Sequence, residues 1–178
     1  MSIYLVRHCS AVGQEPEAEL SDIGQQQALL LAHFLADRGV ARILSSPFKR
    51  AVDSALPLAT ALGLSIEEDL RLAERQLGHV ADGDWVAALQ ESFTQRDLCL
   101  PNGESSETAR SRGSAVVREA LKDSRLPAAI FSHGNLLTLI AHSFDESIGF
   151  AFWQSLSNPD VFELTGKPGA FQLRRVWR

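Results

Sequence analysis

Short apolar segments that end in polar residues alternate along this chain with segments whose apolar residues recur at helical spacing. The first apolar segment is IYLVRHCS, residues 3 to 10, and VARILSSP and LPAAIFSHGN follow further along. Four or five apolar residues in succession predict a buried strand. Because strands that alternate with helices are typical of parallel sheets, we expect an α/β fold with three layers, α/β/α, around a mostly parallel central sheet.

Signals for helix ends separate these strands. Ser21 or Asp22 can cap a first helix, and Gly39 can end it. Pro47 can open a second helix, which Pro57 is expected to bend or interrupt. Further expected elements are a short strand in LSIEEDLRLAE, helices from about residue 85, from 104 to about 124 and over LLTLIAHSF, and a C-terminal hairpin around a GKPG turn at the sheet edge.

Composition limits the class of protein. We expect a single domain over residues 1–178, because this length is enough to bury a core. The formal charge of −5 argues against nucleic acid as the main partner, since binding to a phosphate backbone needs a basic face. No apolar run approaches the roughly 18 residues that span a bilayer, and the start lacks a secretory pattern. We therefore expect a cytoplasmic protein with no membrane partner, and the oligomeric state stays open.

Side chains that can bind anions follow three of the predicted strands. Arg7 and His8 end the first strand, Arg50 follows the second, and His133 follows the third. Because parallel strands have their carboxyl ends at the same edge of a sheet, these groups can converge. Paired guanidinium groups match phosphate oxygens, and the N-termini of the helices after SSP and SHG can add backbone N–H groups. In a chain that is acidic as a whole, this pattern predicts a phosphate pocket.

Six segments of the chain, in this order, resemble the signatures of the histidine phosphatase superfamily, also called the phosphoglycerate mutase-like family. They are VRHCS, LSDIG, SSPFKRAVDSA, the glutamate of RLAERQLG, PNGES and FSHGN. Together they extend from residue 3 to about residue 140, so only the C-terminal hairpin lies outside the match. The resemblance implies a phosphoglycerate mutase-like fold and a phosphatase-type enzyme that needs no metal and no cofactor.

The resemblance also implies roles for individual residues. His8 corresponds to the nucleophile, which forms a phosphohistidine intermediate. Arg7, Arg50 and His133 correspond to groups that hold the phosphoryl oxygens, and His133 also belongs to the catalytic set. Glu74 corresponds to the general acid that protonates the leaving oxygen and then acts as the base for water.

Two further residues are candidates for phosphate binding. Gln14 stands, by simple counting, where the mutases of the family carry a phosphate-binding asparagine, and Asn135 ends the SHGN motif in a form that resembles the mutases. His79, in the loop after Glu74, is a weaker candidate for contact with substrate. We expect the specificity for the leaving group to come from residues 75 to 105.

Cys9 departs from the family, which usually has glycine after the Arg-His pair. A side chain there could narrow the pocket or reorient His8. A thiol beside Arg7 and a phosphate site could also have a lowered pKa and oxidise easily. The simpler expectation is a small side chain accommodated in the turn.

The predicted function is hydrolysis of a small-molecule phosphate ester, a small phosphorylated metabolite. The short chain favours hydrolysis over mutase-type phosphotransfer, because mutases carry inserted segments that exclude water. Phosphatases that act on phosphohistidine in proteins tend to lack the acid glutamate, so Glu74 favours esters of small alcohols. These two activities remain alternatives, as does a non-catalytic phosphate-binding module, which Cys9 motivates.

Two other classes of phosphatase fit the sequence less well. A cysteine phosphatase needs an arginine six residues after its cysteine, where this chain has Glu15 or Ser105. The segment DGDWV matches the motif of aspartate-nucleophile phosphatases, but no strand leads into it. We interpret DGDWV as a polar loop that enters a helix.

Overall fold

The computed structural model describes residues 2–81, 83–167 and 169–177. Within these residues a six-stranded sheet has the order β3-β2-β4-β1-β5-β6. Strands β1 to β4 run parallel to one another, whereas β5 pairs antiparallel with both β1 and β6. The strands are β1 (Ser2–Arg7), β2 (Arg42–Ser45), β3 (Ile66–Glu68), β4 (Ala128–Ser132), β5 (Asp160–Lys167) and β6 (Ala170–Arg175). The predicted mostly parallel sheet is confirmed, and the C-terminal hairpin lies at its edge, although Pro168 of the expected turn lies outside the described residues.

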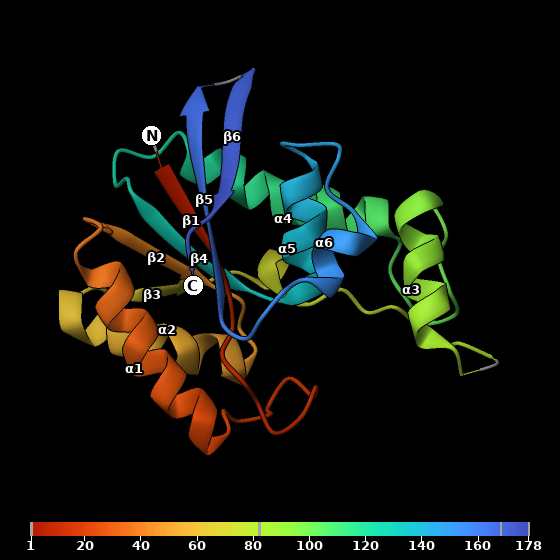
Figure 1. Ribbon diagram of the computed structural model, residues 1–178, viewed down its shortest axis with the longest axis horizontal. Coiled ribbons are helices and arrows are strands. Elements are labelled where there is room, and N and C mark those ends of the chain that lie inside the picture. Colours follow the sequence, from red (N-terminus) through yellow and green to blue (C-terminus); the bar gives the residue numbers. More distant parts are fainter. Residues whose placement is uncertain (1, 82, 168, 178) are drawn as a thin grey trace.

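Helices cover both faces of this sheet (Figure 1). Helices α1 and α2 lie on one face and α4 and α5 on the other, whereas α3 lies apart from the sheet, beyond the end of α4. The helices are α1 (Asp22–Ala36), α2 (Lys49–Leu62), α3 (Trp85–Thr94), α4 (Ser106–Ala120), α5 (Gly134–His142) and α6 (Phe150–Gln154), with a 3-10 helix at Leu70–Leu72. No helix in the described part of the chain is long and apolar enough to cross a membrane.

The two layers of helices bury alternate residues of the same strands. In β1, Ile3 and Leu5 join an apolar cluster with residues of α4 and α5, whereas Tyr4 and Val6 join a second cluster with residues of α1 and α2. Successive side chains of a strand point to opposite faces, so an uninterrupted apolar run requires cover on both sides. The apolar strand at the start of the sequence therefore becomes the middle of a three-layer α/β/α fold.

The helix ends agree only in part with the sequence signals. Ser21 caps α1 by accepting a hydrogen bond from the N–H of Gly24 at 3.1 Å, as predicted. Asp84 caps α3 by accepting from Ala87 N at 3.0 Å, so DGDWV does lead into a helix, although Asp82 lies outside the described residues. Helix α4 ends at Ala120, four residues earlier than expected.

Helix α2 begins later than predicted, and Pro57, which was expected to bend or interrupt it, does not interrupt it. It begins at Lys49, after Pro47, and it continues through Pro57 to Leu62. Pro57 removes one backbone donor, but the residues around it, such as Leu58, stay buried against the core. Because tertiary packing supplies most of the stability of a helix, the loss of one hydrogen bond does not end it here.

Candidate active site

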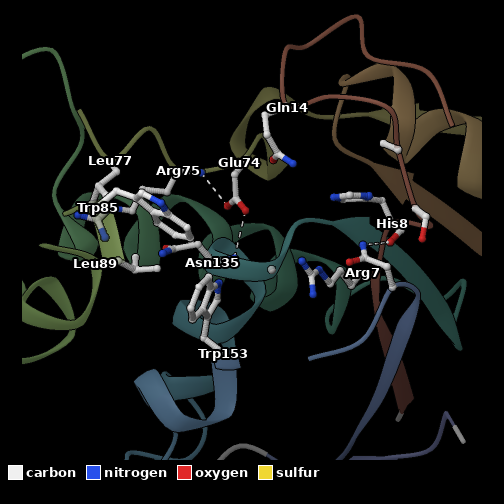
Figure 2. A pocket seen from close by; sticks show the side chains of 14 residues that line it. Arg7, His8, Gln14, Glu74, Arg75, Leu77, Trp85, Leu89, Asn135 and Trp153 are labelled. Atoms are coloured by element: carbon white, nitrogen blue, oxygen red, sulfur yellow. Dashed lines mark hydrogen bonds between the residues drawn. The ribbon is translucent and has the colours of Figure 1, made fainter. Parts of the chain in front are cut away.

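A pocket of about 590 Å³ opens beside the carboxyl ends of β1 and β4 (Figure 2). This is the edge of the sheet where open α/β folds bind ligands. The residues that line the pocket are Arg7, His8, Ser10, Ala11, Gln14, Glu74, Arg75, Leu77, Trp85, Leu89, Gly134, Asn135, Trp153 and Asn158.

The ring of His8 is held in one orientation directly after β1. Its Nδ1 lies 2.6 Å from the carbonyl oxygen of Cys9, and its Nε2 lies 3.3 Å from Nε of Arg50. Because a carbonyl oxygen only accepts hydrogen bonds, Nδ1 carries the proton and donates it. The lone pair of the neutral ring is therefore on Nε2, which accepts a hydrogen bond from the Nε–H of Arg50.

Burial keeps this imidazole neutral. Removal of the ring from water lowers the pKa of His8 to about 4, the hydrogen bond to Cys9 opposes this shift, and the nearby charges of Arg50 and Arg7 add to it. A neutral ring at pH 7 has an unprotonated Nε2, which attack on an electrophile requires.

Two arginines flank His8, of which Arg50 is buried and Arg7 is half-buried. Arg50 is 1% exposed, and its Nη1 donates to the carbonyl oxygens of Gln14 at 3.0 Å and Glu15 at 2.9 Å. Arg7 donates from Nη1 to the carbonyl oxygens of residues 156 and 157, each at 3.3 Å. Burial lowers the pKa of both guanidinium groups, but arginine stays charged in proteins. The two side chains therefore bring fixed positive charge to the pocket.

His133 completes the group from the end of β4. Its ring centroid is 5.2 Å from that of His8, and its Nε2 lies 2.8 Å from Oγ of Ser46. Burial first, and then the neighbouring His8 and arginines, lower the pKa of His133 well below its ordinary value. Arg50 and His133 lie behind the pocket surface, in contact with residues of the site.

Several buried polar atoms of this site lack a hydrogen-bond partner. Among the described residues four buried side-chain atoms are in this condition, and three of them are Nε of Arg7, Nδ1 of His133 and Oδ1 of Asn135. An unsatisfied buried donor costs free energy, so such atoms are rare outside places where a ligand binds. Nε of Arg7 is a donor that lacks an acceptor, which supports the prediction of an anion site, whereas Oδ1 of Asn135 needs a donor.

Gly134 allows the helix α5 to begin against Arg7. A Cβ atom at residue 134 would lie 3.1 Å from Nε of Arg7 and 3.2 Å from its Cζ. Any larger residue would press on the guanidinium group, which explains why glycine follows His133.

Glu74 sits at the N-terminus of α5. Its carboxylate accepts hydrogen bonds from the backbone N–H groups of Arg75 at 2.9 Å, Asn135 at 3.1 Å and Leu136 at 2.9 Å. The sequence predicted that the N–H groups at the start of α5 bind phosphate. In the structure the N–H groups of Asn135 and Leu136 bind the Glu74 carboxylate instead. At α2 the expectation is also wrong for Lys49 N, which donates to a loop carbonyl at 2.8 Å.

The neighbouring acidic residues are engaged elsewhere. Glu67 pairs with Arg42 at 2.7 Å, and Asp69 pairs with Arg71 at 2.7 Å. Glu74 alone among these three carboxylates lines the pocket. The structure therefore separates Glu74 from its acidic neighbours, which the sequence could not do.

The remaining candidates have different positions. Gln14 and Asn135 both line the pocket. His79 is exposed and is not among the lining residues. The predicted specificity segment contributes Leu77, Trp85 and Leu89 to the lining.

Cys9 faces the core and not the pocket. Its side chain is 0% exposed within the apolar cluster that includes Val6 and Leu31, and its N–H donates to Oγ of Ser54 at 2.9 Å. Burial raises the pKa of the thiol to about 11. The expectation of a lowered thiol pKa is therefore wrong, because the side chain turns away from the charges of Arg7 and Arg50.

Sequence reasoning missed several residues of the pocket, among them Trp153 and Asn158. Trp153 comes from α6, which was not predicted, and Asn158 donates from Nδ2 to the carbonyl oxygen of His8 at 2.8 Å. Both lie beyond the segments that carry the family resemblance. The aromatic run FAFWQ was the available signal for Trp153.

The structure is an α/β fold in which Arg7 and His8 line a pocket and the buried Arg50 and His133 lie against His8. Residues 3–177 match the sequence profile of the histidine phosphatase superfamily, branch 1, and the chain belongs to this family. The predicted phosphatase class of enzyme and the phosphoglycerate mutase-like fold are thus confirmed.

Named relatives include phosphatases and mutases. A glucosyl-3-phosphoglycerate phosphatase from Mycolicibacterium vanbaalenii is 29% identical in an alignment that covers 91% of this chain and 82% of the relative. A probable phosphoglycerate mutase from Yersinia pestis is 28% identical over 156 residues, which cover 77% of this chain and 71% of the relative. The solved structure of a mycobacterial glucosyl-3-phosphoglycerate phosphatase with inorganic phosphate has a TM-score of 0.76 at 26% identity and covers 99% of this chain and 96% of its own.

Proposed function

We propose that this chain is a phosphomonoester hydrolase that acts through a phosphohistidine on His8, with no metal ion or other cofactor. The main observation behind this proposal is the orientation of the His8 ring. Its Nδ1–H donates to the Cys9 carbonyl oxygen at 2.6 Å, and its unprotonated Nε2 accepts a hydrogen bond from Arg50. Two guanidinium groups supply the positive charge that a metal ion supplies in other phosphatases.

In the first step, the lone pair on Nε2 of His8 attacks phosphorus and the bond from phosphorus to the alcohol oxygen breaks. Glu74, which is protonated in the substrate complex of this proposal, gives its proton to that oxygen and becomes a carboxylate, so the alcohol leaves neutral. In the second step, water attacks the phosphoryl group, Glu74 takes the proton from the water, and the bond from phosphorus to nitrogen breaks. Inorganic phosphate leaves, and His8 and Glu74 return to their initial states.

The phosphoryl oxygens are held by the groups around His8. We assign Arg50 and His133 to this task because both are buried next to the ring, and Arg7, Gln14 and Asn135 because they line the pocket. In phosphoryl transfer, positioning and charge neutralisation supply most of the rate. Residues 1–178 act as one domain in this proposal.

The substrate we propose is a small phosphorylated metabolite. The relatives named as glucosyl-3-phosphoglycerate phosphatases support hydrolysis of a small ester, and the pocket of about 590 Å³ has room for one.

The test is hydrolysis of p-nitrophenyl phosphate in the presence of EDTA by the wild type, His8→Ala and a control, His79→Ala, which changes an exposed histidine outside the pocket. We expect wild type and control to turn over, and His8→Ala to lose about 10³-fold or more in kcat. Substrate labelled with ³²P should leave a phosphoryl group on the wild type and not on His8→Ala.

Activity that survives in His8→Ala would contradict the mechanism. A wild type that binds inorganic phosphate but neither hydrolyses varied phosphate esters nor acquires the label would instead identify a non-catalytic phosphate-binding module.

A further inference from the structure

The pocket has a second end that the proposed mechanism does not use. Trp85 at the start of α3, Trp153 on α6, Leu77 and Leu89 line the side of the pocket away from His8. Figure 2 shows Trp85, Leu77 and Leu89 on one side of Glu74, and His8 on the other. We call these four residues the apolar wall.

The two tryptophans of the apolar wall form part of a packed aromatic group. Trp85 and Trp153 meet edge to face, with ring centroids 6.0 Å apart and an interplanar angle of 86°. Phe150 stacks on Trp153 at 5.5 Å and also meets Phe93 of α3 at 6.2 Å. These contacts hold α6 against α3, yet Trp85 keeps 53% of its surface exposed. A large exposed aromatic side chain in a pocket is typical of a binding surface.

The position of the apolar wall relative to His8 and Glu74 indicates which part of a substrate the wall would contact. In an in-line displacement the leaving oxygen departs on the side of phosphorus opposite the nucleophile. Glu74, which would protonate that oxygen, lies between His8 and the apolar wall. The carbon skeleton of the leaving alcohol therefore extends toward Trp85 and Trp153.

The chemistry of the wall restricts the kind of alcohol. Arg75 also lines the pocket, but it is 6% exposed, and its Nε and Nη1 already donate to the carbonyl oxygen of Glu104 at 2.9 Å and to Oγ of Ser92 at 2.7 Å. The remaining wall side chains are apolar except for the indole N–H groups. Such a surface favours a flat apolar ring over a polyol, which needs several hydrogen-bond partners.

We propose that the apolar wall is a subsite for an aromatic ring on the leaving group, so that the preferred substrates are phosphate monoesters of alcohols that carry such a ring. This inference rests on the proposed function, because it uses the same pocket and the same direction of departure. Trp85 and Trp153 act in it as specificity-determining residues.

The test compares 1-naphthyl phosphate with glycerol 2-phosphate as substrates for the wild type, Trp85→Leu and Trp153→Leu. Trp177→Leu is the matched control, because Trp177 packs against Phe34, with ring centroids 5.2 Å apart, and does not line the pocket. We expect the ratio of kcat/KM for the two substrates to fall about tenfold in both wall variants, mainly through KM, and to stay at the wild-type value in the control. Trp85→Phe should restore part of the ratio.

Binding of naphthylmethylphosphonate, which cannot be hydrolysed, supplies a readout that does not depend on turnover. Its Kd, measured by titration calorimetry, should rise about tenfold in Trp85→Leu. If the ratio of kcat/KM and this Kd both stay within about twofold of wild type while hydrolysis still requires His8, the subsite is refuted and the proposed function stands. If hydrolysis does not require His8, the proposed function fails, and the Kd alone decides whether the subsite exists. A loss confined to glycerol 2-phosphate would refute the aromatic assignment.

Discussion

The two ends of the pocket are built differently. At the phosphate end, His8 and His133 follow strands β1 and β4 of the central sheet, and Arg50 lies on α2 against it; these three residues are 7%, 0% and 1% exposed. At the other end, Trp85 is 53% exposed and lies on α3, which stands apart from the sheet (Figure 1).

The phosphate end of the pocket depends on the central sheet, whereas the apolar wall depends on peripheral helices. The pairing of β1 with β4 places Arg7 beside Ser132, so the polar ends of both strands meet wherever the sheet forms. The position of the apolar wall depends on contacts between α3 and α6 at the edge of the fold. A family can therefore keep its chemistry on the sheet and vary its substrates on peripheral helices. The predictions below test this division.

The largest effect is expected from Arg50→Ala, at the phosphate end. Removal of the guanidinium group takes away charge that neutralises the phosphoryl group in the transition state, so kcat/KM should fall by about 10³-fold. The fall should be similar for aryl and alkyl phosphates, because Arg50 does not contact the leaving group in the proposed arrangement. Steady-state kinetics on both kinds of ester give the measurement. A fall that depends on the leaving group would contradict the assignment of Arg50 to the phosphoryl group alone.

Glu74→Gln tests the boundary between the two ends. Glutamine keeps the size of the side chain but cannot give a proton to the leaving oxygen. We expect a loss of about 10²-fold in kcat/KM, which reports the first step alone, for glycerol 2-phosphate and a much smaller loss for p-nitrophenyl phosphate, whose leaving group needs no protonation. Equal losses for the two substrates would show that Glu74 does not protonate the leaving oxygen.

The pH dependence of stability tests the burial of His8. Between pH 6.5 and pH 4 the unfolded chain binds a proton at this residue, whereas the folded chain, in which the pKa of His8 is lowered to about 4, does not. The free energy of unfolding should therefore fall as the pH is lowered through this range, by about 2 kcal/mol from pH 7 to pH 5.

Urea unfolding of the wild type and His8→Asn at both pH values isolates this contribution, which the variant lacks. The difference in free energy of unfolding between the two proteins should change with pH. A constant difference would show that the His8 ring is in water.

The smallest effect is expected from Cys9→Gly, which restores the glycine usual in the family. The change removes a fully buried side chain and adds backbone freedom, so the free energy of unfolding should fall by about 1 kcal/mol with little change in kcat/KM. In the wild type, iodoacetamide should modify the exposed Cys99 well before Cys9. Rapid alkylation of Cys9 would contradict its buried position and would indicate that its thiol faces the pocket.

The phosphate end could be predicted from the sequence because its residues sit at strand ends. Arg7, His8 and His133 follow apolar runs that can only be buried strands, and parallel strands end at one edge. The path of α2 through Pro57 could not be predicted, because its stability comes from the buried face and not from local propensity. The short helix α6 carries no capping signal in its sequence.

The sequence by itself determined the layers of the fold, the convergence of two histidines and two arginines, and the family, because periodicity and local motifs carry these properties. Only the tertiary structure decided that the Cys9 thiol turns into the core, that Glu74 and not its acidic neighbours reaches the pocket, and that Trp85 meets Trp153. The direction of a side chain and the meeting of residues 68 positions apart depend on how whole elements pack, and no local pattern encodes that packing.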